Sequence, residues 1–163
     1  MRILFISTFY PPYIVGGWEQ LVQDINEHLQ ERGHTTHVLT SIHGVEEPTH
    51  QPGIDRILTL EGDLHHYDPR NIFSYKQRTK TNLDNTRQTI ETFKPDVIFI
   101  HIMWNLSRGV AWMAEQLCPG RVVYYIADHW PYMPDPHQAY WRDQANNPIL
   151  NLLKQSVAPL PLK

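Results

Sequence analysis

Short, continuous apolar runs constrain the fold of this 163-residue chain more than any other feature. The first run, Arg2 to Thr8, is rich in β-branched and aromatic residues and is closed by Pro11 and Pro12. Strands that are apolar on both faces are typical of parallel sheets covered on both sides. Similar runs from Asp96 to His101 and from Arg121 to Ala127 therefore predict further buried strands of one parallel sheet.

Helical segments alternate with these strands. Apolar residues at helical spacing predict a helix from Trp18 to Arg32, which Gly33 ends. His37 to Thr40 is then a short strand, so the opening residues form a βαβ unit with a crossover helix. The same logic predicts a loop at residues 46–53, a strand at 54–60, and helices at 71–93 and 107–117.

This alternation predicts an α/β fold, a Rossmann-like, doubly wound and mainly parallel sheet flanked by helices, as a single domain over residues 1–163. After Asp128, prolines interrupt an aromatic stretch, and the segment is expected to be rich in loops. Asn147 to Lys154 can form a short helix, but no further strand follows. The pattern is that of a sheet protein cut short.

Composition narrows the classes of function. Lys and Arg number 14 against 17 Asp and Glu, a net charge of −3, and no basic run is present, so nucleic acid is not an expected partner. The N-terminal apolar run is too short for a signal peptide, and no run has a membrane-spanning length. A single cysteine, Cys118, agrees with a reducing compartment, so we expect a cytoplasmic protein.

In open parallel sheets, ligands bind outside the carboxyl ends of the strands. Three loops qualify here, Thr8 to Gly17, His101 to Asn105, and Asp128 to Trp130, and we expect the site where they meet. Gly16 and Gly17 stand just before a helix, where bare backbone N–H groups can approach a diphosphate. The same pair can equally form a plain tight turn.

Each polar or aromatic side chain in these loops can be interpreted either as functional or as structural. Glu19 either complements the helix dipole or contacts substrate. His101 either binds a hydroxyl or phosphate as a near-neutral acid or base, or is a satisfied histidine at a strand end. Asp128, His129 and Trp130 offer a carboxylate, an imidazole and an aromatic platform in a row, or simply cap the strand.

The sequence lacks the motifs of several well-known classes of enzyme. The chain contains no G-x-G-x-x-G, no P-loop lysine and no G-x-S-x-G, which disfavours a classical dinucleotide site, an ATPase and a serine hydrolase. Asp63, His65, His66 and Asp68 cluster in one expected loop, but neighbouring side chains on a loop seldom preorganise a metal site. No H-E-x-x-H, C-x-x-C or Asp-x-Asp accompanies them, so no bound metal is expected.

An ordered set of short motifs resembles family-4 (group 1) glycosyltransferases. The opening matches at Arg2–Ser7, Tyr10–Pro12, Gly16–Glu19 and Arg32–His34. The later strands and loops match at Lys94–Ile98 with His101, and at Val122–Tyr125 followed by Asp128 and Trp130–Pro131. The resemblance covers nearly the whole chain, and the order of the motifs is more specific than any one of them.

The resemblance implies half of a GT-B enzyme that transfers a sugar from a nucleotide-sugar with retention of configuration, without bound metal or other cofactor. This chain would be the N-terminal, acceptor-side domain, and its own C-terminal domain would hold the donor. The acceptor would be a glycan, a lipid-linked molecule or a small molecule. The resemblance also allows peripheral binding at the inner membrane face, although the chain has no basic amphipathic helix that argues for it.

Carried over position by position, the resemblance places Gly16, Gly17 and Glu19 in the loop near the donor phosphate and the acceptor. It assigns His101, Asp128 and His129 to the catalytic site. The commoner family pattern at the last of these positions is His-Asp, whereas this chain has Ala127–Asp128 with His129 one place later. Either His129 takes over the role, or this subgroup binds its donor differently.

Aromatic residues in the same loops are candidates for the acceptor cleft, namely Tyr10, Trp104 and Trp130. A second class of function also stays open at this point. The chain could be a stand-alone Rossmann-like module that binds a nucleotide or glycan without catalysis. A reading frame that stops near Lys163, with tight binding by the isolated chain, would favour that alternative.

Overall fold

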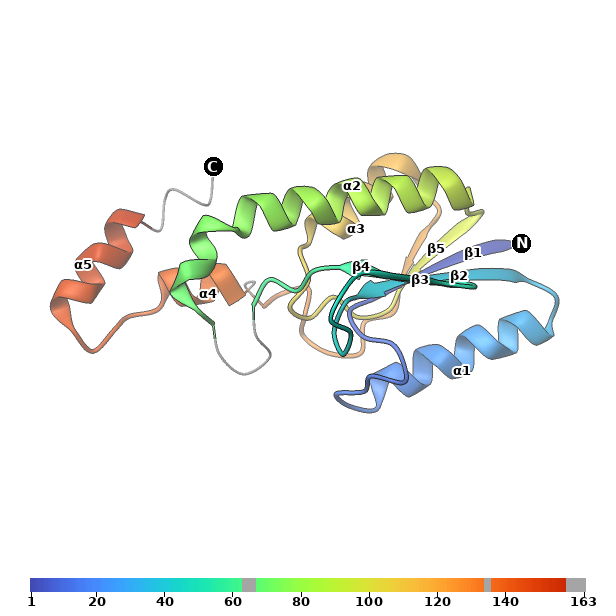
Figure 1. Ribbon diagram of the computed structural model, residues 1–163, viewed down its shortest axis with the longest axis horizontal. Helices are drawn as coiled ribbons and strands as arrows, with labels where there is room; N and C mark the ends of the chain where they lie inside the picture. Colours follow the sequence, from blue (N-terminus) through green and yellow to red (C-terminus); the bar gives the residue numbers. More distant parts are fainter. Residues whose placement is uncertain (63–66, 134–135, 158–163) are drawn as a thin grey trace.

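The computed structural model describes residues 1–62, 67–133 and 136–157, which form a sheet with helices on both faces (Figure 1). The strand order in the described part is β3-β4-β2-β1-β5-β6. The strands are β1 (Arg2–Ser7), β2 (Thr35–Ser41), β3 (Thr49–Gln51), β4 (Ile54–Leu58), β5 (Val97–Ile100) and β6 (Val122–Tyr124). All neighbours pair in parallel except β3 with β4. The predicted Rossmann-like, doubly wound fold is therefore confirmed.

The helices are α1 (Trp18–Glu31), the 3-10 helix η1 (Pro69–Phe73), α2 (Tyr75–Phe93), α3 (Gly109–Leu117), α4 (Pro136–Arg142) and α5 (Pro148–Val157). Figure 1 shows α1 on one face of the sheet and α2 and α3 on the other. Each face has its own apolar cluster. Leu4 and Ile6 face the larger cluster under α2 and α3, whereas Ile3 and Phe5 face α1. Alternation along β1 thus fills both layers, as its continuous apolar sequence predicts.

The opening βαβ unit agrees closely with prediction. β1 pairs with β2 from Arg2 opposite Thr35 to Ser7 opposite Thr40. Helix α1 turns Val22 into the sheet and ends before Gly33, whose φ of 81° is the left-handed conformation that glycine adopts without strain.

Two local predictions need correction. The loop predicted at residues 46–53 contains β3, because Pro52 and Gly53 turn the chain into a hairpin with β4 and Gly53 has a φ of 78°. The helix predicted from Asn71 begins only at Tyr75. The turn before it is the 3-10 helix η1, which starts where the Asp68 carboxylate accepts the backbone N–H of Arg70.

Strand β6 is shorter and more exposed than predicted. It spans three residues, and Val123 is 47% exposed because β6 lies at the edge of the described sheet, paired with β5 alone. An apolar run alone does not distinguish a central strand from an edge strand. The prediction of a fully buried strand at 121–127 is therefore wrong.

The segment after β6 carries α4 and α5, which Figure 1 shows extending away from the sheet. The predicted short helix at 147–154 is confirmed as part of α5, whereas α4 lies in a stretch predicted to be rich in loops. Within the described residues, no helix has both the length and the apolar character needed to span a bilayer.

Candidate functional site

The loops that follow β1, β2 and β5 are tied together at the carboxyl edge of the sheet. The backbone N–H of Thr8 donates to the Ile102 carbonyl at 2.9 Å, and the Thr8 hydroxyl donates to the same oxygen at 3.0 Å. On its other side, Thr8 accepts the N–H of Ser41 at 3.3 Å. The N–H of Tyr125 donates to the Ile100 carbonyl at 2.9 Å, which brings the chain after β6 to the same edge.

The N-terminus of α1 opens onto this edge without a side-chain cap. Gly17 precedes the helix, and a Cβ atom placed on it would meet nothing within 4 Å. The Gly16 N–H donates to Glu19 Oε2 at 3.1 Å, and Glu19 is buried. Uncapped N–H groups and the positive end of the helix dipole favour an anion at Gly17. The Glu19 carboxylate lies beside this N-terminus and places a negative charge there.

His101 is the most unusual side chain of the edge. Its side chain has no exposed surface, and neither ring nitrogen has a hydrogen-bond partner among the described residues. Its ring stacks on Tyr125, with the centroids 5.1 Å apart and the planes at 4°. Buried polar atoms are rarely left without partners, and such atoms cluster at functional sites.

The electrostatic surroundings keep His101 neutral. Burial lowers the pKa of its imidazole below the usual value near 6.5, and the negative charge of Glu19 opposes that shift without reversing it. A neutral imidazole can donate from one nitrogen and accept at the other. His101 is therefore equipped to bind a hydroxyl group, or to exchange a proton with one.

Acid should destabilise the chain through His101. Between the lowered folded pKa and about 6.5, the unfolded state binds more protons than the folded state, so the free energy of unfolding falls as pH falls. Urea unfolding at about pH 7.5 and about pH 5.5 measures this loss. The variant His101→Gln cannot titrate and should lose less stability over this interval than the wild type. Equal losses in both proteins would contradict a buried neutral imidazole.

Asp128 and His129 lie in the turn after β6. Asp128 Oδ1 accepts the N–H of Trp130 at 2.8 Å, and the His129 carbonyl accepts the N–H of Tyr132 at 2.9 Å. The His129 side chain is exposed. Among the described hydrogen bonds none links either side chain to His101, whose ring nitrogens have no partner in the described part of the chain.

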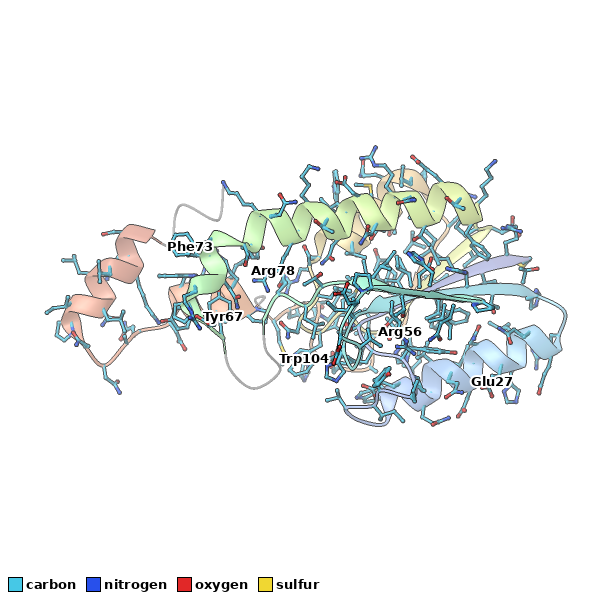
Figure 2. All side chains as sticks on the ribbon, viewed as in Figure 1. Glu27, Arg56, Tyr67, Phe73, Arg78 and Trp104 are labelled. Carbon is cyan, nitrogen blue, oxygen red and sulfur yellow. The ribbon has the colours of Figure 1, made fainter. Side chains whose placement is uncertain are left out.

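Trp104 and Trp130 line one cavity, between the loop after β5 and the loop after β6. Trp104 is 37% exposed at the loop end of the sheet (Figure 2) and packs edge-on against Phe9. Trp130 is 7% exposed and belongs to the apolar cluster under α3. The structure thus brings together two of the three predicted acceptor-cleft residues, one as an outer surface and one as an inner wall.

Tyr10, the third of these residues, lies elsewhere. Its ring is buried against α1, and its hydroxyl accepts the Asn26 amide N–H at 2.9 Å. Burial raises the pKa of the Tyr10 hydroxyl, with the Asn26 hydrogen bond opposing the shift. A ring held in the packing between loop and helix does not present a face to a ligand, so the structure does not place Tyr10 in the cleft.

The sequence did not predict the roles of two side chains near the site. Arg56 on β4 is 1% exposed and lies between the sheet and α1 (Figure 2). It donates from Nη1 to the Tyr10 carbonyl at 3.0 Å and from Nη2 to the Pro11 carbonyl, which fixes the start of the loop leading to the glycine pair. Tyr125 supplies the stack on His101. Neither role has a motif, because both arise from packing between distant segments.

The loop considered for metal binding contributes little to the described structure. Residues 63–66 lie outside the described residues, and Asp68 pairs with the exposed Arg70 at 2.6 Å. In residues 1–62, 67–133 and 136–157, no group of three His, Cys, Asp or Glu side chains is placed to hold a metal ion.

Comparisons with known proteins place this arrangement in a family. Residues 15–159 match the family described as Glycosyltransferase Family 4, which is most of the chain. The chain belongs to glycosyltransferase family 4. No curated protein sequence matches it.

The solved structure of sucrose-phosphate synthase from Thermosynechococcus elongatus shares the fold of this family-4 domain. The TM-score is 0.52 at 17% sequence identity, and the match covers 84% of this chain. Only 38% of the synthase is covered, so the chain spans well under half the length of that protein. At this identity the likeness shows the fold, a Rossmann-like half of the GT-B type.

Proposed function

We propose that this domain is the acceptor-side half of a retaining glycosyltransferase that takes its sugar from a nucleotide-sugar. The observation that carries the proposal is the pairing of an uncapped α1 N-terminus at Gly17 with a buried histidine, His101, that lacks hydrogen-bond partners among the described residues. The first suits a diphosphate, and the second suits a sugar hydroxyl.

The chemistry of sugar transfer makes use of both features. The transition state separates an oxocarbenium-like ring from a departing diphosphate, so stabilising the developing negative charge is a major catalytic task. Backbone N–H groups and the helix dipole at Gly17 can supply that stabilisation without a bound metal. His101 would accept or donate a hydrogen bond at a hydroxyl of the transferred sugar once its ring, which has no exposed surface here, is uncovered.

The remaining parts of the enzyme follow from the same proposal. A second, C-terminal domain would hold the nucleotide-sugar, and closure of the two domains would bring the diphosphate onto the α1 N-terminus. The acceptor would bind on this chain, near the cavity lined by Trp104 and Trp130. The isolated chain would then be nearly inactive.

Substitution of Gly17 tests the placement of the diphosphate. In the enzyme expressed from its full reading frame, Gly17→Trp should lower transfer by at least about 100-fold, because an indole would occupy the open space that the anion needs. Gly17→Ala is the matched control. A Cβ there meets nothing within 4 Å, and Gly17 does not have a positive φ, so its folding should be unaffected.

For both Gly17 variants, kcat/KM for the nucleotide-sugar is measured at a fixed acceptor concentration. Thermal unfolding of both proteins shows whether the indole has disturbed the fold. Normal turnover by a folded Gly17→Trp enzyme would show that the diphosphate does not approach this helix.

A further inference from the structure

The cavity beside Trp130 is lined by two side chains with polar atoms that have no partner among the described residues. It is lined chiefly by Glu61, Met103, Trp104, Asn105, Arg108 and Trp130. Asn105 is 4% exposed, and its Oδ1 has no hydrogen-bond partner among the described residues. The same is true of the indole Nε1–H of Trp130. Two lining residues thus hold an acceptor and a donor that have no partner among the described residues.

The backbone around this cavity is held firmly in place. Asn105 has a φ of 57°, in the left-handed region that asparagine adopts more readily than most other non-glycine residues. Its Nδ2 donates to the Gly62 carbonyl at 2.7 Å, and its carbonyl accepts the N–H of Glu61 at 2.9 Å. On the other side, Arg108 donates to the Trp130 carbonyl at 3.3 Å.

Size limits what can enter. The cavity measures about 50 Å³, room for a few non-hydrogen atoms but not for a nucleobase or a whole sugar ring. Trp104 also lines the cavity and is 37% exposed, so part of its indole ring is open to solvent. A ring resting on Trp104 could therefore extend one or two substituents into the cavity.

Charge and polarity select the kind of substituent. Glu61, 4% exposed, brings a carboxylate to the lining, and Arg108 brings a guanidinium. A phosphate group would meet the Glu61 carboxylate, and an alkyl chain would bury the polar atoms of Asn105 and Trp130 without partners. A hydroxyl group donates and accepts at once, and so suits both atoms.

We propose that this cavity binds the hydroxylated edge of a neutral sugar ring whose flat face rests on Trp104. Resting on the function proposed above, the inference makes the acceptor a glycan or a free sugar and not a phosphate-anchored lipid. The cavity lies on the α3 side of the sheet, in the larger apolar cluster, whereas His101 faces α1. Acceptor and donor sugar would therefore contact different side chains of the same edge.

Nuclear magnetic resonance of the 163-residue chain tests this site directly, because each tryptophan gives one indole N–H signal. The variant Trp130→Phe identifies the signal of Trp130. Methyl glucoside, methyl galactoside, methyl mannoside and N-acetylglucosamine are then titrated, with inorganic phosphate at matched ionic strength as a control. We expect at least one sugar to shift the Trp130 and Trp104 signals saturably, and phosphate to leave them unchanged.

Variants separate binding from folding. Trp130→Phe keeps an aromatic wall but loses the N–H donor, and Asn105→Gly keeps the left-handed backbone but loses the amide, so each should weaken sugar binding about fivefold or more. Trp112→Phe is the matched control, since Trp112 lies on α3, is 56% exposed and does not line the cavity. It should leave binding unchanged.

Two outcomes would overturn the inference. No saturable shift of the Trp130 signal with any of these sugars would indicate a cavity that holds only water, and a shift with phosphate alone would indicate an anion site. The proposed function fails separately. If the full-length protein bound sugars at Trp130 but had no transferase activity, the sugar site proposed here would stand. The catalytic role proposed for His101 would then be wrong.

Discussion

Replacement of His101 by phenylalanine is expected to reduce sugar transfer by at least about 100-fold without lowering the stability of the protein. Phenylalanine preserves the ring that stacks on Tyr125 at 5.1 Å and removes two buried nitrogens that lack partners among the described residues. Each unsatisfied buried nitrogen costs about 1 to 3 kcal/mol in folding. A ring without them should therefore fold at least as well.

The His101→Phe experiment distinguishes a role in sugar transfer from a role in packing, because transfer is expected to fall while stability is not. A histidine that served only the packing would show no loss of kcat/KM when a ring of similar shape replaces it. A histidine that binds the reacting sugar is retained at a cost in stability, and its loss appears in transfer alone. His28→Ala is the control, because His28 is exposed on the last turn of α1, away from Glu19.

Replacement of Arg56 by methionine should lower the free energy of unfolding by about 3 kcal/mol. The buried guanidinium donates to the carbonyls of Tyr10 and Pro11, and its charge lies over the ring of Tyr13, 5.2 Å from the centroid. Methionine fills part of the same volume but leaves two carbonyls without donors. Burial lowers the pKa of Arg56, yet an arginine side chain stays charged at neutral pH.

Urea unfolding measures the Arg56 effect, and Arg70→Ala provides the contrast. Arg70 pairs with Asp68 at the surface with its side chain 86% exposed, so its removal should leave stability almost unchanged. The Arg56 variant should also bind nucleotide-sugar more weakly in the full-length enzyme, because the loop that Arg56 fixes leads to Gly16 and Gly17. Equal stability of both variants would show that Arg56 does not hold this loop.

Local pattern predicted most of the fold. The helix from Trp18 and its end before Gly33 follow from apolar spacing and glycine conformation, which depend only on nearby residues. The strand at 121–127 was misjudged because exposure depends on position within the sheet, and a one-dimensional pattern does not contain that position. β3 was missed although the Pro52–Gly53 turn signal was present.

The candidate site was predictable to a similar degree. Topology brings the ends of β1 and β5 to one edge, so His101 and the glycine pair could be expected near each other from their order alone. The Tyr125 stack, the Arg56 anchor and the surroundings of the Asn105 Oδ1 atom depend on side-chain packing across the fold. Tyr10 was expected in the acceptor cleft with Trp104 and Trp130, but its ring packs against α1 and does not line the cavity that those two residues share.

The most direct test of the account is a transfer assay on the protein expressed from its full reading frame. Nucleotide-sugars are supplied singly with a mixture of glycan, lipid-linked and small-molecule acceptors, and labelled product is measured for the wild type and His101→Phe. The account predicts transfer by the wild type from at least one donor, and a loss of at least about 100-fold in a variant that remains folded. A reading frame that ends without a donor-binding half, or undiminished transfer by His101→Phe, would contradict it.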